Sequence, residues 1–178
     1  MMTTGERIGS VRAPERLASH HDLSQFQNGK HPSLDEWLKR RALASEGMSS
    51  RTYVITEEDH PVQVVGYYAI STAMAQRATL PSAKMRQGTP DEVPLLLIGR
   101  LAIDQRWQGL QLGSALLADA LQRCLAASEI AGVRAVVVHA IDDDAVRFYQ
   151  NHGFLLSPLG ARVLVMPIEV IRDIYQTT

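Results

Sequence analysis

The sequence predicts a single domain over residues 1–178 of the α/β (α+β) class, with a mixed central sheet of six to seven strands flanked by helices. The 178 residues are 46% hydrophobic and 21% charged, which suits a globular protein with one sizeable core. Runs rich in Val, Ile, Tyr and Thr fill the first half, and a strand–helix–strand–helix–strand order fills the second. The second pattern predicts a parallel crossover connection.

The first half opens with a short candidate strand within "IGSVRAPERL" and then a helix over 32–47. In that helix Ser33 and Glu36 stand at capping-box spacing, and Asp35 lies in the first turn, where the helix dipole favours a carboxylate. Gly47 is the expected stop signal.

Residues 50–59 and 61–73 then predict two strands joined by a polar turn. The segment 74–92 carries two prolines and a glycine, and we expect an irregular excursion there. Residues 93–104, "VPLLLIGRLAID", are almost all apolar, as in a central strand covered on both faces.

The second half continues with a helix that begins after "RWQGLQLG" and runs to about Ala127. Residues 132–140 predict a central strand, and 142–153 predict a short helix with three aspartates at its positive end. "FLLSP" and residues 161–167 complete the sheet, and a short helix, "IEVIRDIY", follows.

The bulk properties exclude several classes of protein. A net charge of −1 argues against a protein that coats nucleic acid by bulk electrostatics. No apolar run reaches the roughly 18 residues of a membrane span, and the N-terminus lacks a signal-peptide pattern, so we expect a cytoplasmic protein with no membrane partner. Cys124 is the single cysteine and lies in a helical apolar stripe, which favours a buried role.

The turn at 106–117, "RWQGLQLGSALL", carries the most chemical information. A glycine-bearing turn between a strand and a helix presents backbone N–H groups at the positive end of the helix dipole, which favours a phosphate. Gly109 and Gly113 permit close approach of a ligand, although two glycines four residues apart are by themselves a weak signal. The chain has no Gly-Lys-Ser/Thr and no Rossmann fingerprint, which excludes both of those nucleotide sites.

The stretch "RLAIDQRWQGLQLGSALL" resembles the cofactor motif of the GNAT superfamily of acetyltransferases, and "DDDAVRFYQNHGF" resembles the second motif of that family. The resemblance extends to "FQNGKHPSLDEWL", "SRTYVI" and "VVGYYAI". This larger set is similar to the GNAT-type toxins of bacterial toxin–antitoxin pairs, which acetylate the amino group of aminoacyl-tRNA. The resemblance implies a GNAT fold, acetyl-CoA as co-substrate and no metal.

The resemblance also implies a set of cofactor-binding residues. Backbone groups of Leu101, Ala102 and Ile103 would pair with the pantetheine arm like an added strand. Gln108 takes the first motif position, and the N–H groups that would face the pyrophosphate belong to Gly109, Leu110, Gln111, Leu112, Gly113 and Ser114. Gln111 departs from the family, which usually has glycine there. Because a left-handed backbone costs an L-residue roughly 1 kcal/mol or more, we expect weakened rather than abolished acetyl-CoA binding.

Acetyl transfer from a thioester to an amine needs a neutral amine and benefits from a proton donor for the thiolate. The resemblance assigns the general acid to Tyr149, whereas the alternative is that Phe148 and Tyr149 are core aromatics. His139, at the end of the 132–140 strand, is the candidate base by residue type, and a packing role is the more common one for such a residue. An α-amino group has a pKa of about 7.7–8.0 and a lysine about 10.4. The lack of an obvious base therefore favours aminoacyl-tRNA over lysine.

The partners and alternatives also follow from the resemblance. It implies an aminoacyl-tRNA substrate, a small DNA-binding antitoxin and a homodimer. The candidate phosphate contacts are Lys39, Arg40 and Arg41, a second group of Arg77, Lys84 and Arg86, and Arg100 unless it forms a buried ion pair. The alternatives are a GNAT enzyme that acts on a small amine or a protein N-terminus, and a binding module that lost turnover through Gln111.

Overall fold

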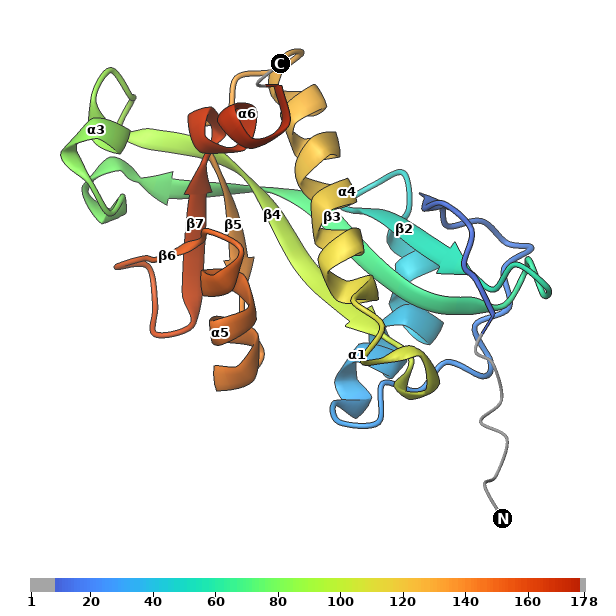
Figure 1. The fold of residues 1–178 in the computed structure, drawn as a ribbon. Helices are drawn as coiled ribbons and strands as arrows, with labels where there is room; N and C mark the ends of the chain where they lie inside the picture. The colour runs from blue at the N-terminus through green and yellow to red at the C-terminus, as the bar shows by residue number, and fades with distance from the viewer. Residues whose placement is uncertain (1–8, 177–178) are drawn as a thin grey trace. The chain divides into compact units, whose positions relative to one another are not determined.

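A computed structural model describes residues 9–176, and it has a seven-stranded mixed sheet in the order β1-β2-β3-β4-β5-β7-β6 (Figure 1). The strands are β1 (Glu15–Arg16), β2 (Arg51–Thr56), β3 (Val64–Gln76), β4 (Glu92–Ile103), β5 (Ala135–His139), β6 (Leu155–Leu156) and β7 (Val163–Pro167). β4 and β5 pair in parallel, while β5 pairs with β7 antiparallel. The predicted class and the parallel crossover are confirmed.

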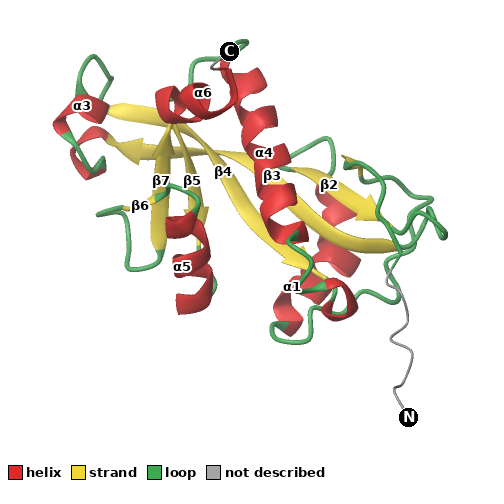
Figure 2. Ribbon diagram, viewed as in Figure 1, coloured by secondary structure: helices red, strands yellow, loops and turns green. Residues whose placement is uncertain are grey.

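Figure 2 shows the helices and strands, and their order along the chain is as expected from the sequence except in the segment 74–92. The helices are α1 (Pro32–Trp37), the π-helical turn η1 (Leu38–Ala42), α2 (Leu43–Ser45), the 3-10 turn η2 (Arg77–Thr79), α3 (Ala83–Arg86), the 3-10 turn η3 (Gln105–Trp107), α4 (Leu112–Ser128), α5 (Asp143–Asn151) and α6 (Ile168–Gln176). The chain groups into two compact units, Met1–Tyr68 with Leu101–Leu116, and Ala69–Arg100 with Leu117–Thr178. β3 and β4 contribute residues to both units.

The core of the first unit lies where the helix α1–η1 packs against β2 and β3. Leu34 and Leu38 from the helix are buried together with Val54 of β2 and Tyr67 of β3. The hydroxyl of Tyr67 donates a hydrogen bond to the Leu34 carbonyl at 2.7 Å. This bond fixes the first turn of the helix on the sheet, because both partners are buried.

The predicted capping box at the start of this helix is wrong. His31 is the N-cap, it makes no side-chain cap bond, and Pro32 takes the first helical positions. Because the helix starts before Ser33, that hydroxyl is inside the first turn and cannot cap it. The Asp35 carboxylate instead accepts a hydrogen bond from the backbone N–H of Asn28 at 2.8 Å. The first turn is thereby tied to the loop that precedes it.

The second unit packs the excursion after β3 against β5 and β7. Leu80 and Met85 from the excursion are buried with Val93 of β4, Val137 of β5 and Val165 of β7. The sequence predicted an irregular segment over 74–92, whereas β3 continues to Gln76 and two short helical turns, η2 and α3, follow it. Apolar contacts of these turns supply the stability that local propensity does not.

Arg134 joins three segments of the second unit. Its guanidinium pairs with both carboxylate oxygens of Glu169 on α6, at 2.5 and 3.0 Å. The same group donates to the backbone carbonyls of Lys84 and Met85 on α3. The bidentate pair lowers the pKa of Glu169 below its ordinary value of 4.5, mainly through the hydrogen bonds from Arg134.

This ion pair predicts an acid-dependent loss of stability. Because the folded-state pKa of Glu169 is lowered, its contribution to the free energy of unfolding is complete above pH 4.5 and is lost as the pH falls toward the lowered value. Glu169→Gln removes that contribution, so its urea midpoint should fall below wild type at neutral pH and approach it in acid. The control is Glu92→Gln, an exposed carboxylate on β4. A urea midpoint of Glu169→Gln that differs from the wild-type midpoint by the same amount at every pH would contradict the prediction.

The structure bears on the predicted burial of Cys124 and on the search for a membrane span. Cys124 is a fully buried free thiol on α4, as predicted, and burial raises its pKa to about 12. Among the residues that the structure describes, no helix combines the length and the apolar character needed to cross a membrane.

Candidate active site

One edge of β4 is open at its C-terminal end. The register with β5 pairs Leu95–Ile98 with Ala135–Val138, and it stops before the residues 101–103. Ala102 and Ile103 are buried, and Leu101 is half-buried. An unpaired strand edge can bind an extended chain of amide groups by adding it as another strand. The residues predicted to bind pantetheine, Leu101, Ala102 and Ile103, lie beyond this pairing, and the Ile103 carbonyl already accepts hydrogen bonds from the side chains of Asn28 and Gln108.

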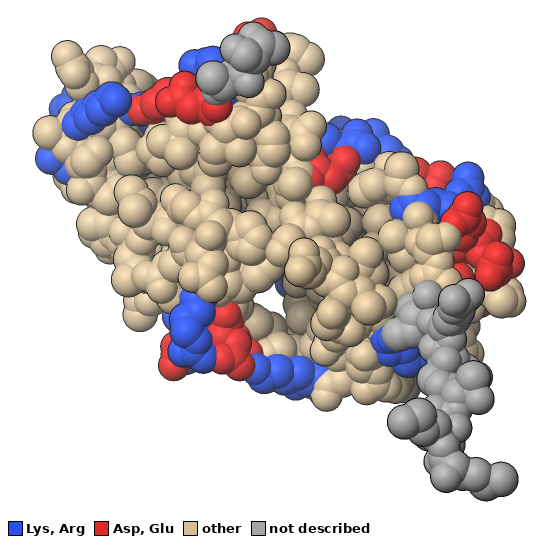
Figure 3. All heavy atoms as spheres, viewed as in Figure 1, with Lys and Arg blue, Asp and Glu red and all other residues tan. Residues whose placement is uncertain are grey.

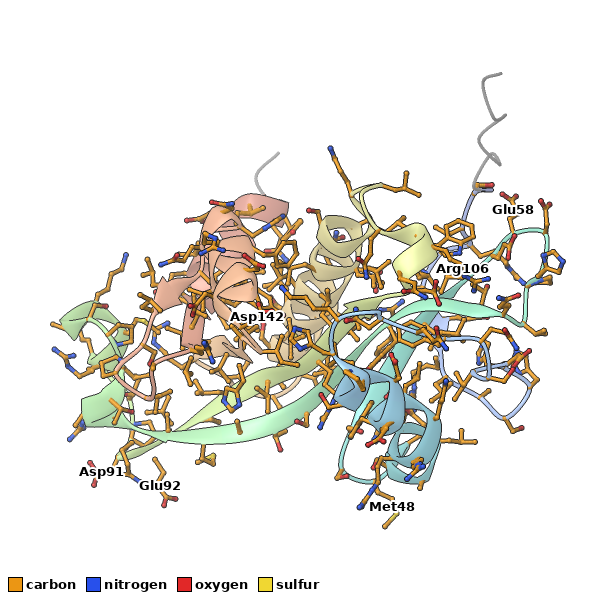
Figure 4. The ribbon with its side chains drawn as sticks, turned by 90° about the horizontal axis from the view of Figure 1, so that it is seen from below. Met48, Glu58, Asp91, Glu92, Arg106 and Asp142 are labelled. Carbon is orange, nitrogen blue, oxygen red and sulfur yellow. The ribbon has the colours of Figure 1, made fainter. Side chains whose placement is uncertain are left out.

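The turn after β4 is held by the buried carboxylate of Asp104. This residue is 0% exposed, and its side chain caps η3 by accepting a hydrogen bond from the Arg106 N–H at 2.9 Å. The same oxygen accepts from the Arg106 side-chain Nε at 3.1 Å, and the other oxygen accepts from the Gln27 N–H at 3.0 Å. Figure 4 labels Arg106, whose side chain is about half exposed at 53%. Neither Asp104 nor Gln27 was predicted from the sequence.

The loop at residues 26–31 is tied to the same turn by amide side chains. Asn28 and Gln108 both donate to the carbonyl of Ile103, at 3.1 and 3.0 Å, and Gln108 also donates to the Asn28 carbonyl at 2.8 Å. A carbonyl oxygen has two lone pairs, so the Ile103 carbonyl is fully used. Gln108, predicted to bind the cofactor, therefore has a bracing role in the turn. Asn-Gly in "FQNG" was the available sequence signal for this loop.

The phosphate-type turn between η3 and α4 has the left-handed backbone that its glycines suggest. Gly109 has φ 80°, and Gln111, with φ 62°, is the one non-glycine residue with positive φ among the residues described. Gly113 lies within α4, and Leu110 is exposed. The Ala115 N–H donates to the Gln111 carbonyl at 3.2 Å as the helix begins. The N–H groups of the first turn thus precede the helical ladder and carry its positive dipole end.

Gln111 is expected to store conformational strain. A positive φ costs a residue with a Cβ atom roughly 1–2 kcal/mol, and glycine avoids this cost. Glycine in turn loses about 0.5–1 kcal/mol more than other residues on folding, because its unfolded state is freer. Gln111→Gly should therefore raise the free energy of unfolding by up to about 1 kcal/mol in urea titrations. Gln111→Val should lower it by more than about 1 kcal/mol, because β-branched residues tolerate this region worst. A Gly variant less stable than the Val variant would contradict this account.

Tyr149 is the buried member of the aromatic pair on α5, being 6% exposed. Its ring makes edge-on contacts with Phe148 and Phe154, with centroids 5.2 and 5.4 Å away. Asp142, labelled in Figure 4, caps this helix by accepting from the Ala145 N–H at 2.8 Å. These contacts fix the phenol ring, as a core aromatic would be fixed.

The Tyr149 hydroxyl is nevertheless available for chemistry. It makes no hydrogen bond within residues 9–176. The fully enclosed polar side-chain atoms that lack a hydrogen-bond partner belong to Ser50, Thr52 and Thr56, so the Tyr149 hydroxyl is not one of them. Burial raises the pKa of Tyr149 well above 10, so the phenol keeps its proton at cellular pH. The rigidly held phenol therefore has a proton to give, and its raised pKa makes it a weaker acid than an exposed tyrosine. His139, the candidate base, is exposed at the end of β5, opposite Val163.

The two candidate basic groups differ in their partners. Arg77 pairs with Asp91 at 3.0 Å, and Arg86 donates to the Leu80 carbonyl at 2.8 Å, so both stabilise the segment between β3 and β4. Lys39, Arg40 and Arg41 are exposed on η1, and within the described chain no salt bridge engages them. Figure 3 shows cations and acids side by side in small groups on the visible face. The η1 group is thus the better candidate for phosphate contacts, and Arg100 is half-buried with a partner of its own.

One cluster of the described residues has ligand atoms at metal-binding distances, formed by Glu15, His20 and His21. The buried His21 accepts the Ala18 N–H on Nδ1 at 2.9 Å, so its proton lies on Nε2, which donates to Glu15 at 2.9 Å. Both ring nitrogens are therefore engaged. A cation would have to displace the bond to Glu15, so the cluster is a structural link between β1 and the following loop.

Two curated relatives cover most of the chain. Residues 49–155 match the family described as "Acetyltransferase (GNAT) domain". The chain is 40% identical over 151 residues to the "tRNA-acetylating toxin" of Mycobacterium tuberculosis (strain ATCC 25618 / H37Rv), covering 85% of this chain and 89% of that protein. It is 30% identical over 186 residues to the "Probable toxin TacT" of Sinorhizobium fredii (strain NBRC 101917 / NGR234), covering 98% and 99%.

Solved structures of toxins have the same fold. AtaT complexed with acetyl-methionyl-tRNAfMet matches with a TM-score of 0.85 and 27% identity, covering 93% of this chain and 99% of AtaT. AtaTR bound with AcCoA matches with a TM-score of 0.79 and 28% identity, covering 93% and 98%. A tyrosine-to-phenylalanine mutant of AtaT bound to the C-terminus of the antitoxin AtaR matches with a TM-score of 0.79 and 25% identity, covering 94% and 99%.

Proposed function

The chain belongs to the GNAT acetyltransferase family, and we propose that it is the toxin of a type II toxin–antitoxin pair that transfers acetyl from acetyl-CoA to the α-amino group of aminoacyl-tRNA. Such a transfer blocks translation, because an acetylated amine cannot form the next peptide bond. The observation that carries the proposal is the open edge of β4 followed by a left-handed turn into α4. The similarity over 85% of the chain to a tRNA-acetylating toxin supports the choice of substrate.

Acetyl-CoA is the co-substrate, and its parts have complementary groups on the first unit. The amides of the pantetheine arm pair with the β4 backbone at Leu101, Ala102 and Ile103, where the Ile103 carbonyl is already engaged by the side chains of Asn28 and Gln108. The pyrophosphate lies at the positive end of α4, against N–H groups of the residues 109–114. The similar structure of AtaTR, which holds acetyl-CoA, supports this assignment. No residue of this account requires a metal ion.

Tyr149 acts as the general acid in this mechanism. The substrate amine attacks the thioester carbonyl, the C–S bond breaks, and the phenol gives its proton to the departing thiolate. The amine proton leaves to solvent, and the Tyr149 phenolate takes up a proton from solvent. The neighbouring ester lowers the pKa of the aminoacyl amine below the value of about 7.7–8.0 of a free α-amino group, so much of the aminoacyl-tRNA is already neutral and needs no protein base. This removes the need to assign a catalytic role to His139.

The remaining proposals concern partners and location. Phosphates of the tRNA contact Lys39, Arg40 and Arg41. A small DNA-binding antitoxin binds and neutralises the toxin, and the similar structure of AtaT bound to the antitoxin AtaR supports this partner. The protein acts as a homodimer in the cytoplasm. We also propose that residues 1–178 act as a single GNAT domain.

The proposal is tested by offering charged and uncharged tRNA side by side, with labelled acetyl-CoA. We expect label in charged tRNA only. Label in a peptide N-terminus or a small amine, with no response to charged tRNA, would favour the alternative of a general GNAT enzyme. Failure to bind acetyl-CoA at all would favour the alternative of a binding module that has lost turnover. The first variant to test in that case is Gln111→Gly, because Gln111 has a left-handed backbone.

A further inference from the structure

The buried carboxylate of Asp104 has more donors than a helix cap needs. An N-cap satisfies one or two N–H groups of its own turn, and here the Arg106 N–H takes that place at 2.9 Å. The second oxygen accepts from the N–H of Gln27, a residue 77 positions earlier in the chain, at 3.0 Å. Asp104 thus joins the two stretches of chain that meet at the cofactor turn.

The cost of burying this charge indicates a specific role. An ionised carboxylate without exposure requires hydrogen bonds and a counter-charge, and Asp104 has three donors, with the Arg106 guanidinium as its cation. An exposed serine or aspartate would cap a three-residue 3-10 turn without that cost. The burial of Asp104 is explained if this carboxylate also holds the 26–31 loop in place against the turn.

The loop itself reaches the backbone that would bind the cofactor. Asn28 donates to the Ile103 carbonyl, while the Gln105 N–H donates to the Gln27 carbonyl at 2.8 Å. Gly29, with φ 86°, permits this approach, since a Cβ atom there would come within 2.5 Å of the Gln105 side-chain oxygen. The end of β4 and η3 are therefore braced from one side by a single loop, and Asp104 holds the centre of that brace.

We propose that Asp104 is a positioning residue for acetyl-CoA, which fixes the β4 edge and the 109–114 turn by binding the 26–31 loop through the Gln27 N–H. The inference rests on the proposed use of that turn for acetyl-CoA. Asp104 does not touch the reacting atoms. Loss of the Asp104 carboxylate should therefore weaken the binding of acetyl-CoA and leave kcat at saturating acetyl-CoA nearly unchanged.

The test compares Asp104→Asn with wild type by acetyl-CoA titration calorimetry without tRNA, and by kcat and KM in the acetylation assay. The amide keeps the shape but turns one acceptor into a donor that faces a backbone N–H. We expect Kd and KM for acetyl-CoA to rise about tenfold or more, with kcat within about twofold. Asn28→Ala, which breaks the brace from the loop side, should change Kd in the same direction by a smaller factor and serves if Asp104→Asn does not fold.

The control is Leu38→Ala, which destabilises the same unit through its core without touching the brace. Measured well below its melting temperature, it should bind acetyl-CoA like wild type. An equal loss of binding in Leu38→Ala, or unchanged binding in both brace variants, would overturn the inference while leaving the proposed function intact. If wild type itself fails to bind acetyl-CoA, the proposed function and this inference fail together.

Discussion

Tyr149→Phe is expected to lower kcat for acetylation of charged tRNA by about 100-fold or more, with little change in stability. General acid catalysis contributes roughly 10²–10⁴-fold, and phenylalanine lacks the proton that the thiolate leaving group receives. The ring contacts with Phe148 and Phe154 do not involve the hydroxyl, so the variant keeps its packing. Acetyl-CoA affinity should stay within about twofold, which separates the loss of chemistry from a loss of binding.

The matched control is Tyr175→Phe on α6, another tyrosine whose pKa is raised by burial. It removes the same hydroxyl group from the second unit and should leave kcat unchanged. Equal effects of the two substitutions would indicate a general structural cause. Wild-type kcat in Tyr149→Phe would assign Tyr149 to the core, as its burial alone suggests.

The triple variant Lys39→Ala, Arg40→Ala, Arg41→Ala is expected to weaken binding of charged tRNA by about 10- to 100-fold at physiological salt. Each cation that no longer binds a phosphate also reduces the slope of log affinity against log salt, by roughly 0.7–0.9, so the slope should fall by about 2. The three side chains are exposed on η1, whereas Leu38 and Ala42 on the same turn are buried, so the fold should tolerate the change.

The control for this prediction is the double variant Arg77→Ala, Lys84→Ala in the second unit. Arg77 already pairs with Asp91, and Figure 4 places Asp91 and Glu92 together at the start of β4. Two acids there disfavour a phosphate, so this variant should retain most tRNA affinity. A larger loss in the double variant than in the triple variant would move the tRNA contact to the segment between β3 and β4.

Sequence patterns predicted most elements because their causes are local. Apolar runs specified β4 and β5, and Gly153, with φ 95°, ended α5 as a left-handed stop. The left-handed backbone at Gln111 also followed from its place in the motif. In contrast, α3 could not be predicted, because its stability comes from Met85 and Leu80 packing against distant strands.

Sequence patterns predicted the backbone geometry of the candidate site, and they missed the side-chain contacts made by residues from far along the chain. The β4 edge and the turn into α4 are consecutive, and a short motif describes them. The bond from Gln27 to Asp104 joins residues 77 positions apart, and neither residue type signals its partner. Gln108 shows the same limit, because its amide serves the Ile103 and Asn28 carbonyls.

The most direct test of the central claim is to identify the acetylated atom. Charged tRNA is incubated with acetyl-CoA and the protein, digested with a ribonuclease that leaves the 3′-terminal adenosine, and analysed by mass spectrometry. The account predicts N-acetyl-aminoacyl-adenosine, absent when the tRNA is deacylated first and when Tyr149→Phe replaces wild type. Acetyl groups found on tRNA bases, or on protein amines with the aminoacyl-adenosine unmodified, would contradict it.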